Sequence, residues 1–589
     1  GSRVIAQRSA QAEFLNQVFT SSDAPFARGR AVTGQFGKVE DWTTEDLSKS
    51  SRQVVKTAIE RRTPLLEALA SIARPDDGSI FQRISSELVS QIDQVCAESL
   101  PDAELSEELA GAGLLPLFGF PTQVRNLYLE RPGRGRQGAY VDRESTIAIH
   151  EFAPGAEIVR DKAVHVVVGI ANYDSNGHST KPFLGMQDAS ICSSCLTAQA
   201  HHQANRVPSP NHCTVCGAFP PLYKTFKAID PLGYRTEYQS LPYEPGRRHG
   251  NRRTLPKIGF TETIPRHIAN ADAPLFRPAR IYSFALNGND EFRFQKAQSG
   301  RDPLDGLIDS RFLSDYDFQN RANTQGWMKT SDTELKTAFL AERTTDALLL
   351  RALKMPPEVV LTGTSPEGRG AWSSLAFALR TLAATRLDVE PSEFEVGLAP
   401  AFHDGGAIGG LFLADTIENG AGYASAVSER IEDYLAEIPA FFDRAHRIGG
   451  PCDSSCHRCL RDYQNWPWYP LLDWRMADSL SRVLLARDFD SHAYAEMDER
   501  ISRQLVREFG AELIEPDSSD ECFGMLMDSR RGRRLALVTH PFLSKDAKQP
   551  PRWVQRQAER VDADEVFLTS YFQLAREPQV VLQQLLGSN

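Results

Sequence analysis

The spacing of the cysteines is the sequence feature that most constrains this chain. Seven of its nine cysteines fall into two tight clusters, which are Cys192-x2-Cys195 with Cys213-x2-Cys216, and Cys452-x3-Cys456-x2-Cys459. Two CxxC pairs place four thiolates on two facing turns, which is the arrangement of a tetrahedral zinc ribbon. Gly217 follows the second pair and supplies the backbone freedom that such a turn needs. We therefore predict a structural zinc ribbon over 190–217, with a redox pair as the alternative.

The second cluster is a clip of three thiolates, and it also indicates a bound metal ion. Its fourth ligand is left open by the sequence, with His446, His403 and His457 as the candidates. Zn²⁺ is the expected ion at both clusters, and an Fe–S cluster is the alternative at the second because thiolates hold those as well. The isolated Cys96 and Cys522 are predicted to be ordinary buried thiols.

Composition narrows the class of protein. The chain has 589 residues, of which 41% are hydrophobic and 24% charged, and these values are typical of globular proteins rather than fibrous or disordered ones. The net charge of −11 disfavours a free-standing, non-specific nucleic-acid binder, although local basic patches could still contact DNA. Because we find neither a long apolar run nor a signal core, we expect a cytoplasmic protein without membrane contact.

The changing pattern of apolar, polar, Gly and Pro residues along the chain predicts a multidomain α/β protein. The predicted parts are a helical N-terminal region (1–110), a β-rich domain with the zinc ribbon (111–300), a linker or mobile loop (301–334), a cysteine-rich α/β domain with the second metal clip (335–490) and a small C-terminal α/β domain (491–589). Within them we expect helices over 51–73, 79–111 and 333–353. The run 145–159 is predicted to be strand-like.

We find no motif for catalysis in the sequence. The segment 33–38 approaches a phosphate-binding loop but is too short and lacks the hydroxyl residue after Lys38. Asp528 precedes a predicted strand, as in restriction-type nucleases, but the expected Glu-x-Lys is missing. We therefore predict no enzymatic activity for this chain and no catalytic residues, with a metal-dependent nuclease or an Fe–S redox enzyme as the alternatives.

Several motifs occur in an order typical of one family. They are the runs 113–129, 148–159 and 166–170, the CxxC ribbon, the runs 373–398 and 411–424, and the second cysteine clip followed by 461–474. This order over roughly 110–480 resembles the region downstream of the motor in Mrf-type repair helicases, which ends in a cysteine-rich metal-binding domain. Two departures stand out: the motor does not precede the match, and Trp474 replaces a residue that tends to be basic.

A motorless chain with this arrangement is similar to the DrmB family of the DISARM phage-defence system. The resemblance implies a non-catalytic accessory subunit of a bacterial antiphage complex. It further implies a DrmA-type helicase as partner, and single- or double-stranded DNA that the complex binds and restricts. A structural adaptor without DNA contact is the remaining alternative.

Three basic stretches are candidates for contact with DNA phosphates. The best is Arg247, Arg248, Arg252, Arg253 and Lys257; the second comprises Arg125, Arg131, Arg134 and Arg136; the third is Arg530, Arg531, Arg533 and Arg534. The aromatic residues of 461–474 could stack single-stranded bases. Packing around the metal clip is the interpretation that we favour for them.

Overall fold

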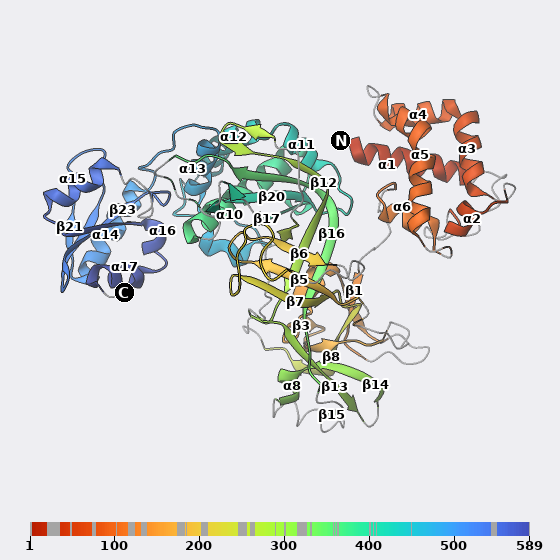
Figure 1. Ribbon diagram of the computed structural model, residues 1–589, viewed down its shortest axis with the longest axis horizontal. Coiled ribbons are helices and arrows are strands. Elements are labelled where there is room, and N and C mark those ends of the chain that lie inside the picture. The colour runs from red at the N-terminus through yellow and green to blue at the C-terminus, as the bar shows by residue number, and fades with distance from the viewer. Residues whose placement is uncertain are drawn as a thin grey trace.

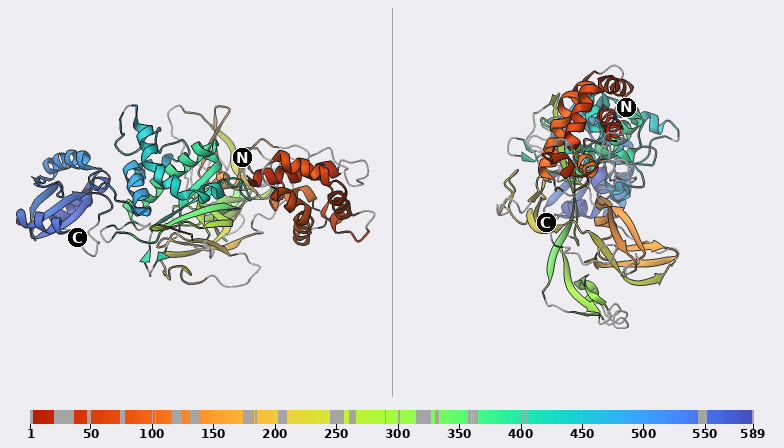
Figure 2. Two further views of the ribbon diagram at one scale, coloured as in Figure 1. Left: turned by 90° about the horizontal axis from the view of Figure 1, so that it is seen from above. Right: turned by 90° about the vertical axis from the view of Figure 1, so that its right-hand side faces the viewer.

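Along its longest axis the protein consists of a helical N-terminal part, a central part and a small C-terminal unit (Figures 1 and 2). The central part contains both the β-rich middle and the α/β region that follows it. The computed structural model describes residues 3–19, 36–46, 50–73, 78–99, 101, 103–115, 124–130, 138–173, 183, 185–201, 210–244, 256–259, 266–288, 290–299, 302–314, 327–329, 333–356, 359, 361, 365–399, 402–403, 406–407, 409–448, 450–543 and 551–587. The predicted fold class is confirmed: a helical N-terminal part, a β-rich middle and a C-terminal α/β region with cysteine clusters in the middle and in the α/β region.

The N-terminal part is a helical unit with its own apolar core. Its helices are α1 (Arg3–Phe19), α2 (Val39–Thr43), α3 (Ser51–Arg61), α4 (Thr63–Ala73), α5 (Ser79–Glu98) and α6 (Leu105–Gly111). Phe14, Trp42 and Leu88 lie at the centre of this core. The two long helices expected here are each interrupted. Pro64 opens α4 and Pro101 separates α5 from α6, because proline cannot donate the hydrogen bond that would continue a helix.

The middle of the molecule is built of β-strands joined by one long strand. The elements are β1 (Val124–Tyr128), β2 (Tyr140–Glu144), α7 (Ser145–Glu151), β3 (Glu157–Arg160), β4 (Ala163–Ile170), β5 (Gln187–Cys192), β6 (Ala198–His201), β7 (Tyr223–Ile229), β8 (Gly233–Pro242), β9 (Lys257–Ile258), β10 (His267–Ile268), β11 (Ala271–Asp272), β12 (Leu275–Ala285), β13 (Phe292–Ser299), β14 (Asp302–Asp309), α8 (Ser310–Ser314), β15 (Trp327–Lys329) and β16 (Leu335–Ala352). The run expected as strand at 145–159 therefore begins with the helix α7.

The strand β16 corrects two predictions. The segment 333–353 was expected to be a helix, yet β16 pairs antiparallel with β12, β13 and β20. Most of β16 is buried on both faces, including polar residues, so its side chains lack the alternation that would separate a strand from a buried helix. The linker expected over 301–334 contains β14, which pairs with β13 and β4. The boundary expected at 335 thus falls inside one continuous sheet.

The α/β region packs its helices on the far end of this sheet. Its elements are α10 (Pro366–Leu387), η3 (Pro391–Glu393), β17 (Phe394–Leu398), β18 (Phe402–His403), β19 (Gly406–Ala407), β20 (Gly410–Asp415), α11 (Tyr423–Glu429), α12 (Ile431–His446), the 3-10 helix η4 (Trp466–Leu471) and α13 (Trp474–Leu484). Helix α10 is buried nearly all round, between β17 and β20 on one side and α12 and α13 on the other. It therefore fixes the loop that carries the second cysteine cluster.

The C-terminal part is a small α/β unit. It comprises α14 (Ala495–Phe509), β21 (Glu512–Ile514), β22 (Gly524–Ser529), β23 (Gly532–Thr539), α15 (Arg552–Arg560), β24 (Glu565–Ser570), α16 (Tyr571–Leu574) and α17 (Pro578–Leu586), with sheet order β21-β22-β23-β24. His540 joins it to the α/β region, because its Nε2 lies 3.1 Å from the Ser479 hydroxyl of α13. Among the helices that the structure describes, none has the length and apolarity needed to cross a bilayer.

Candidate metal centres and nucleic-acid contacts

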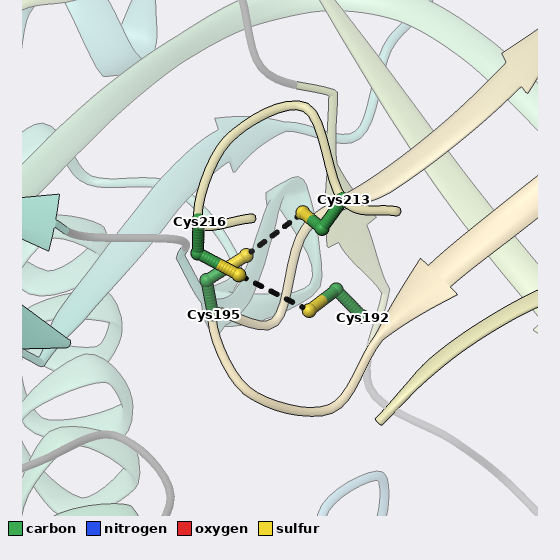
Figure 3. A group of neighbouring side chains, drawn as sticks. All are labelled: Cys192, Cys195, Cys213 and Cys216. Carbon is green, nitrogen blue, oxygen red and sulfur yellow. Dashed lines mark hydrogen bonds between the residues drawn. The ribbon is translucent and has the colours of Figure 1, made fainter. Parts of the chain in front are cut away.

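The first cysteine cluster closes around a single point (Figure 3). Cys192 ends β5, Cys195 lies on the turn before β6, and Cys213 and Cys216 lie on a facing turn before β7. The four sulfur atoms all lie within 4.8 Å of one another. The Cys192–Cys216 and Cys195–Cys213 sulfurs are each 3.5 Å apart, so neither pair is a disulfide. Four free thiols, buried or half-buried, that converge in this way form a ligand set for a metal ion.

The geometry of this cluster fits zinc. Zinc–sulfur bonds of about 2.3 Å in a tetrahedron place the sulfurs roughly 3.8 Å apart. The residue after each CxxC pair has a left-handed backbone, with φ of 64° at Leu196 and 74° at Gly217. The freedom expected of Gly217 is thus used. Burial raises the pKa of Cys195, so the free thiol is held in the protonated form, and a bound cation would favour the thiolate.

The second cluster gains a fourth ligand from helix α12. The Nε2 atom of His446 and the sulfurs of Cys452, Cys456 and Cys459 lie within 4.8 Å of one another. The Cys452 sulfur is 3.5 Å from His446 Nε2 and 3.9 Å from the Cys459 sulfur. Of the two candidate histidines whose side chains the structure describes, His446 belongs to this group and His457 does not; the side chain of His403 lies outside the described residues. Hydrogen bonding with Cys459 lowers the pKa of Cys452 to about 5, which prepares a thiolate for a metal ion.

Aromatic residues enclose the second cluster. The ring of His446 packs against Trp474 and Phe442, at centroid distances of 5.0 Å and 6.4 Å. The Trp474 indole N–H donates to the Cys452 carbonyl at 3.0 Å. Trp474, the position that departs from the helicase pattern, therefore supports the metal-binding loop.

In the segment after the clip, Tyr469 donates its hydroxyl to the Asp462 carbonyl at 2.6 Å, whereas Tyr463 is 86% exposed. The structure thus shows packing for Tyr469 and leaves the Tyr463 ring exposed to solvent.

The glycine turn at 419–422 shapes the backbone. The Asp415 carboxylate accepts the backbone N–H groups of Ala421 and Ala424 at 2.6 Å and 2.7 Å, which caps the start of α11. Gly420 has φ of 70°, and a Cβ there would lie 2.6 Å from the Asp346 carboxyl carbon. This segment therefore has a structural role as the turn between β20 and α11.

Most of the predicted DNA-contact residues lie outside the described part of the chain. These are Arg131, Arg134, Arg136, Arg247, Arg248, Arg252 and Arg253. Two that are described change the prediction. Arg125 makes a two-pronged ion pair with Asp230, at 3.0 Å and 2.5 Å, so its donors are already used. Lys257 lies in β9, and burial, followed by the positive charge of Arg369, lowers its pKa. Cys195 and Cys192 are also among the groups that act on it, so Lys257 belongs to the surroundings of the first cluster.

Arg533 and Arg534 of the third basic stretch, and the nuclease candidate Asp528, make local ion pairs, whereas Arg530 and Arg531 are exposed. Arg534 pairs with Glu565 and donates to the Gln584 carbonyl. Asp528 is 89% exposed and lies 3.5 Å from Arg533. A metal-dependent nuclease needs several carboxylates converging on one ion. Among the described residues, the two cysteine clusters are the groups of three or more His, Cys, Asp or Glu side chains that converge in that way.

Comparison with known proteins adds a family for the second cluster. Residues 375–460 match the family model described as MrfA Zn-binding domain, and all four ligands of the second cluster lie inside this match. The match and the two ligand groups together support zinc binding by this chain. Sequence reasoning did not single out Arg343 and Arg380, although an arginine inside the apolar run 375–384 is an unusual signal.

The chain is also similar to a longer defence protein. Over 426 residues it is 27% identical to "Druantia protein DruE" of Escherichia coli strain UMEA 4076-1, which covers 65% of this chain and 22% of DruE. The chain therefore spans about a fifth of that relative's length. A solved structure, of the DUF1998 helicase MrfA bound to DNA, aligns with a TM-score of 0.33 at 10% identity, covering 71% of this chain and 46% of that chain.

Proposed function

We propose that this protein is a zinc-stabilised accessory subunit of an antiphage defence complex and that it helps a helicase partner to hold foreign DNA. The observation that carries the proposal is the match of 375–460 to the MrfA Zn-binding domain, together with the 426-residue similarity to DruE. MrfA is a helicase, and DruE is a protein of a defence system. The finer proposal is that the system is DISARM, that the chain is its DrmB subunit and that the partner is a DrmA-type helicase in the cytoplasm.

The proposal gives this chain a binding role and places the ATPase in the partner. Zinc would be held at closed structural sites, because each of the two groups offers four protein ligands, enough for a tetrahedral ion. Their task would be to fix loops that a small apolar core could not hold. The DNA grip would come from the basic stretches, with Arg247, Arg248, Arg252 and Arg253 as the main phosphate contacts and Arg134 and Arg136 as secondary ones.

Co-purification with the helicase tests the proposal. The tagged helicase should retain the full-length chain on a column, and the complex should bind duplex DNA more tightly than the helicase alone. No retention would contradict the partnership. Retention without any gain in DNA affinity would support the adaptor without DNA contact.

A further inference from the structure

A pocket of about 420 Å³ lies apart from both metal clusters. Its wall is formed by the start of α7, the strands β16 and β17, helix α10 and the 3-10 helix η4. Sequence segments that are far apart thus meet around one cavity. Trp468 of η4 brings to it the segment that directly follows the second cysteine clip.

Two buried arginines face this pocket, each with a donor that has no partner. Arg343 and Arg380 are 5% and 4% exposed. One terminal nitrogen of each arginine pairs with a carboxylate: Arg343 with Glu395, and Arg380 with Asp462. The Nε–H groups of both arginines are buried and have no hydrogen-bond acceptor in the structure. Buried donors without acceptors are rare and destabilising, so the two arginines form a polar wall of the pocket whose hydrogen bonding is incomplete.

The charges around the pocket favour a neutral ligand over a phosphate. Both guanidinium groups are already paired with carboxylates, and Glu144 adds a further negative charge to the lining. A phosphate would meet these carboxylates at close range and gain no net positive charge. The part of the ligand that enters the pocket therefore carries acceptor atoms but no full negative charge.

Aromatic side chains define the shape of the ligand. Phe377 and Trp468 lie with ring centroids 6.2 Å apart, and the Arg380 guanidinium lies over the Phe377 ring at 4.9 Å. Phe394 contributes a third ring to the lining. Flat aromatic and guanidinium faces stack on flat heterocycles, and base carbonyl oxygens and ring nitrogens accept from arginine.

We infer that this pocket receives an unpaired nucleobase, whose acceptor edge meets the guanidinium groups of Arg343 and Arg380 and whose ring lies against Trp468. The inference rests on the proposed DNA-binding function and names the part of the DNA that this surface takes. The base comes from a single strand or from a free nucleotide, and the two sources share the chemistry that the pocket recognises.

A pair of tryptophan variants on the same helix tests the inference. Trp468 lines the pocket, whereas Trp466 is 49% exposed and does not. The probe is a thymidine oligonucleotide with one central 2-aminopurine, whose fluorescence is quenched by stacking. The wild-type full-length chain and Trp466→Leu should quench it, and Trp468→Leu should bind about tenfold more weakly and lose the quenching. Equal behaviour of Trp468→Leu and wild type, or an equal loss in both variants, would overturn the pocket.

A second variant tests the arginine donor itself. Arg380→Lys keeps a positive charge opposite Asp462 but removes the flat guanidinium with its several N–H donors, so probe affinity should fall severalfold while the zinc content stays unchanged. Calorimetric titration with deoxynucleoside monophosphates separates the two sources of the base. Binding heat in wild type that is lost in Trp468→Leu assigns the site to free nucleotides. No binding heat from the monophosphates, with fluorescence quenching of the oligonucleotide retained, assigns the site to a single strand. Independence of both ligands from Trp468 would overturn the inference. Failure of the proposed function would show instead as no duplex binding by the helicase complex.

Discussion

The indole N–H of Trp474 donates to the backbone carbonyl of Cys452 at 3.0 Å. This bond ties the first residue of α13 to the first thiolate of the second metal cluster. The same indole packs on the ring of His446, the fourth ligand. One side chain thus orients two ligands that come from different segments, in the manner of the outer partners that tune metal sites.

Replacing this tryptophan should loosen the second metal site. Trp474→Phe keeps an aromatic ring near His446 but removes the N–H donor, so we expect zinc affinity to fall by about tenfold. Competition with a chromogenic chelator measures the change. Trp466→Phe is the matched control because Trp466 is half exposed and does not contact either ligand group. Equal zinc release by the two variants would contradict the role of Trp474.

The two clusters should bind metal independently. Cys456→Ser should reduce the zinc content from about two ions to about one per chain, and Cys195→Ser should do the same by emptying the other cluster. Elemental analysis of purified protein gives both numbers. Iron together with visible absorbance in anaerobically purified wild type would replace zinc by an Fe–S cluster at the second site. Loss of both ions in either variant would show that the clusters depend on each other.

The contact between the C-terminal unit and α13 should weaken in acid. Burial lowers the pKa of His540 to about 3, so its ring stays neutral in the folded chain but is protonated near pH 6.5 in the unfolded one. The unfolded state then binds more protons, and this group's contribution to stability falls as the pH drops from about 6.5 to about 3, by about 1.4 kcal/mol per pH unit.

Thermal denaturation across that pH range measures the effect of His540. The variant His540→Gln should show a flatter pH dependence of the melting temperature than wild type. The matched control is His492→Gln, because His492 is exposed and should leave the dependence unchanged. An unaltered pH dependence in His540→Gln would remove His540 as the titrating group.

The cysteine spacing predicted both metal clusters because ligand distance along the chain sets ligand geometry within a turn. Spacing alone could not choose among His446, His403 and His457. His446 ends helix α12, and its position relative to the clip depends on how α12 packs against α10 and α13. Such long-range packing leaves no local signal in one sequence.

Features that local sequence did not reveal have physical causes of the same kind. The segment that forms β16 is buried on both faces, which hides the alternation of a strand. The ion pair of Arg125 joins it to Asp230, more than a hundred residues away, so its neighbours in sequence do not show that this candidate phosphate contact already has an anionic partner. The pocket of Arg343 and Arg380 likewise forms from strand, helix and loop segments that meet only in the folded chain.

The best basic stretch should carry the salt dependence of DNA binding. Replacing Arg247, Arg248, Arg252 and Arg253 by Ala should weaken duplex binding by the complex and lower the slope of log K against log salt by about one for each lost phosphate contact. Fluorescence anisotropy at several salt concentrations gives the slope. Arg125→Ala is a useful comparison, because the ion pair with Asp230 predicts a loss of stability without a change in slope. An unchanged slope in the fourfold variant would remove this stretch from the DNA path.

The DNA-stimulated ATPase of the proposed DrmA-type helicase, measured with and without this chain, tests the accessory-subunit proposal most directly. We expect the added chain to raise the activity or to lower the DNA concentration needed for half-activation. We expect the fourfold arginine variant to show less of this effect. An ATPase that responds to DNA identically in both conditions, with no complex on gel filtration, would contradict the accessory-subunit account.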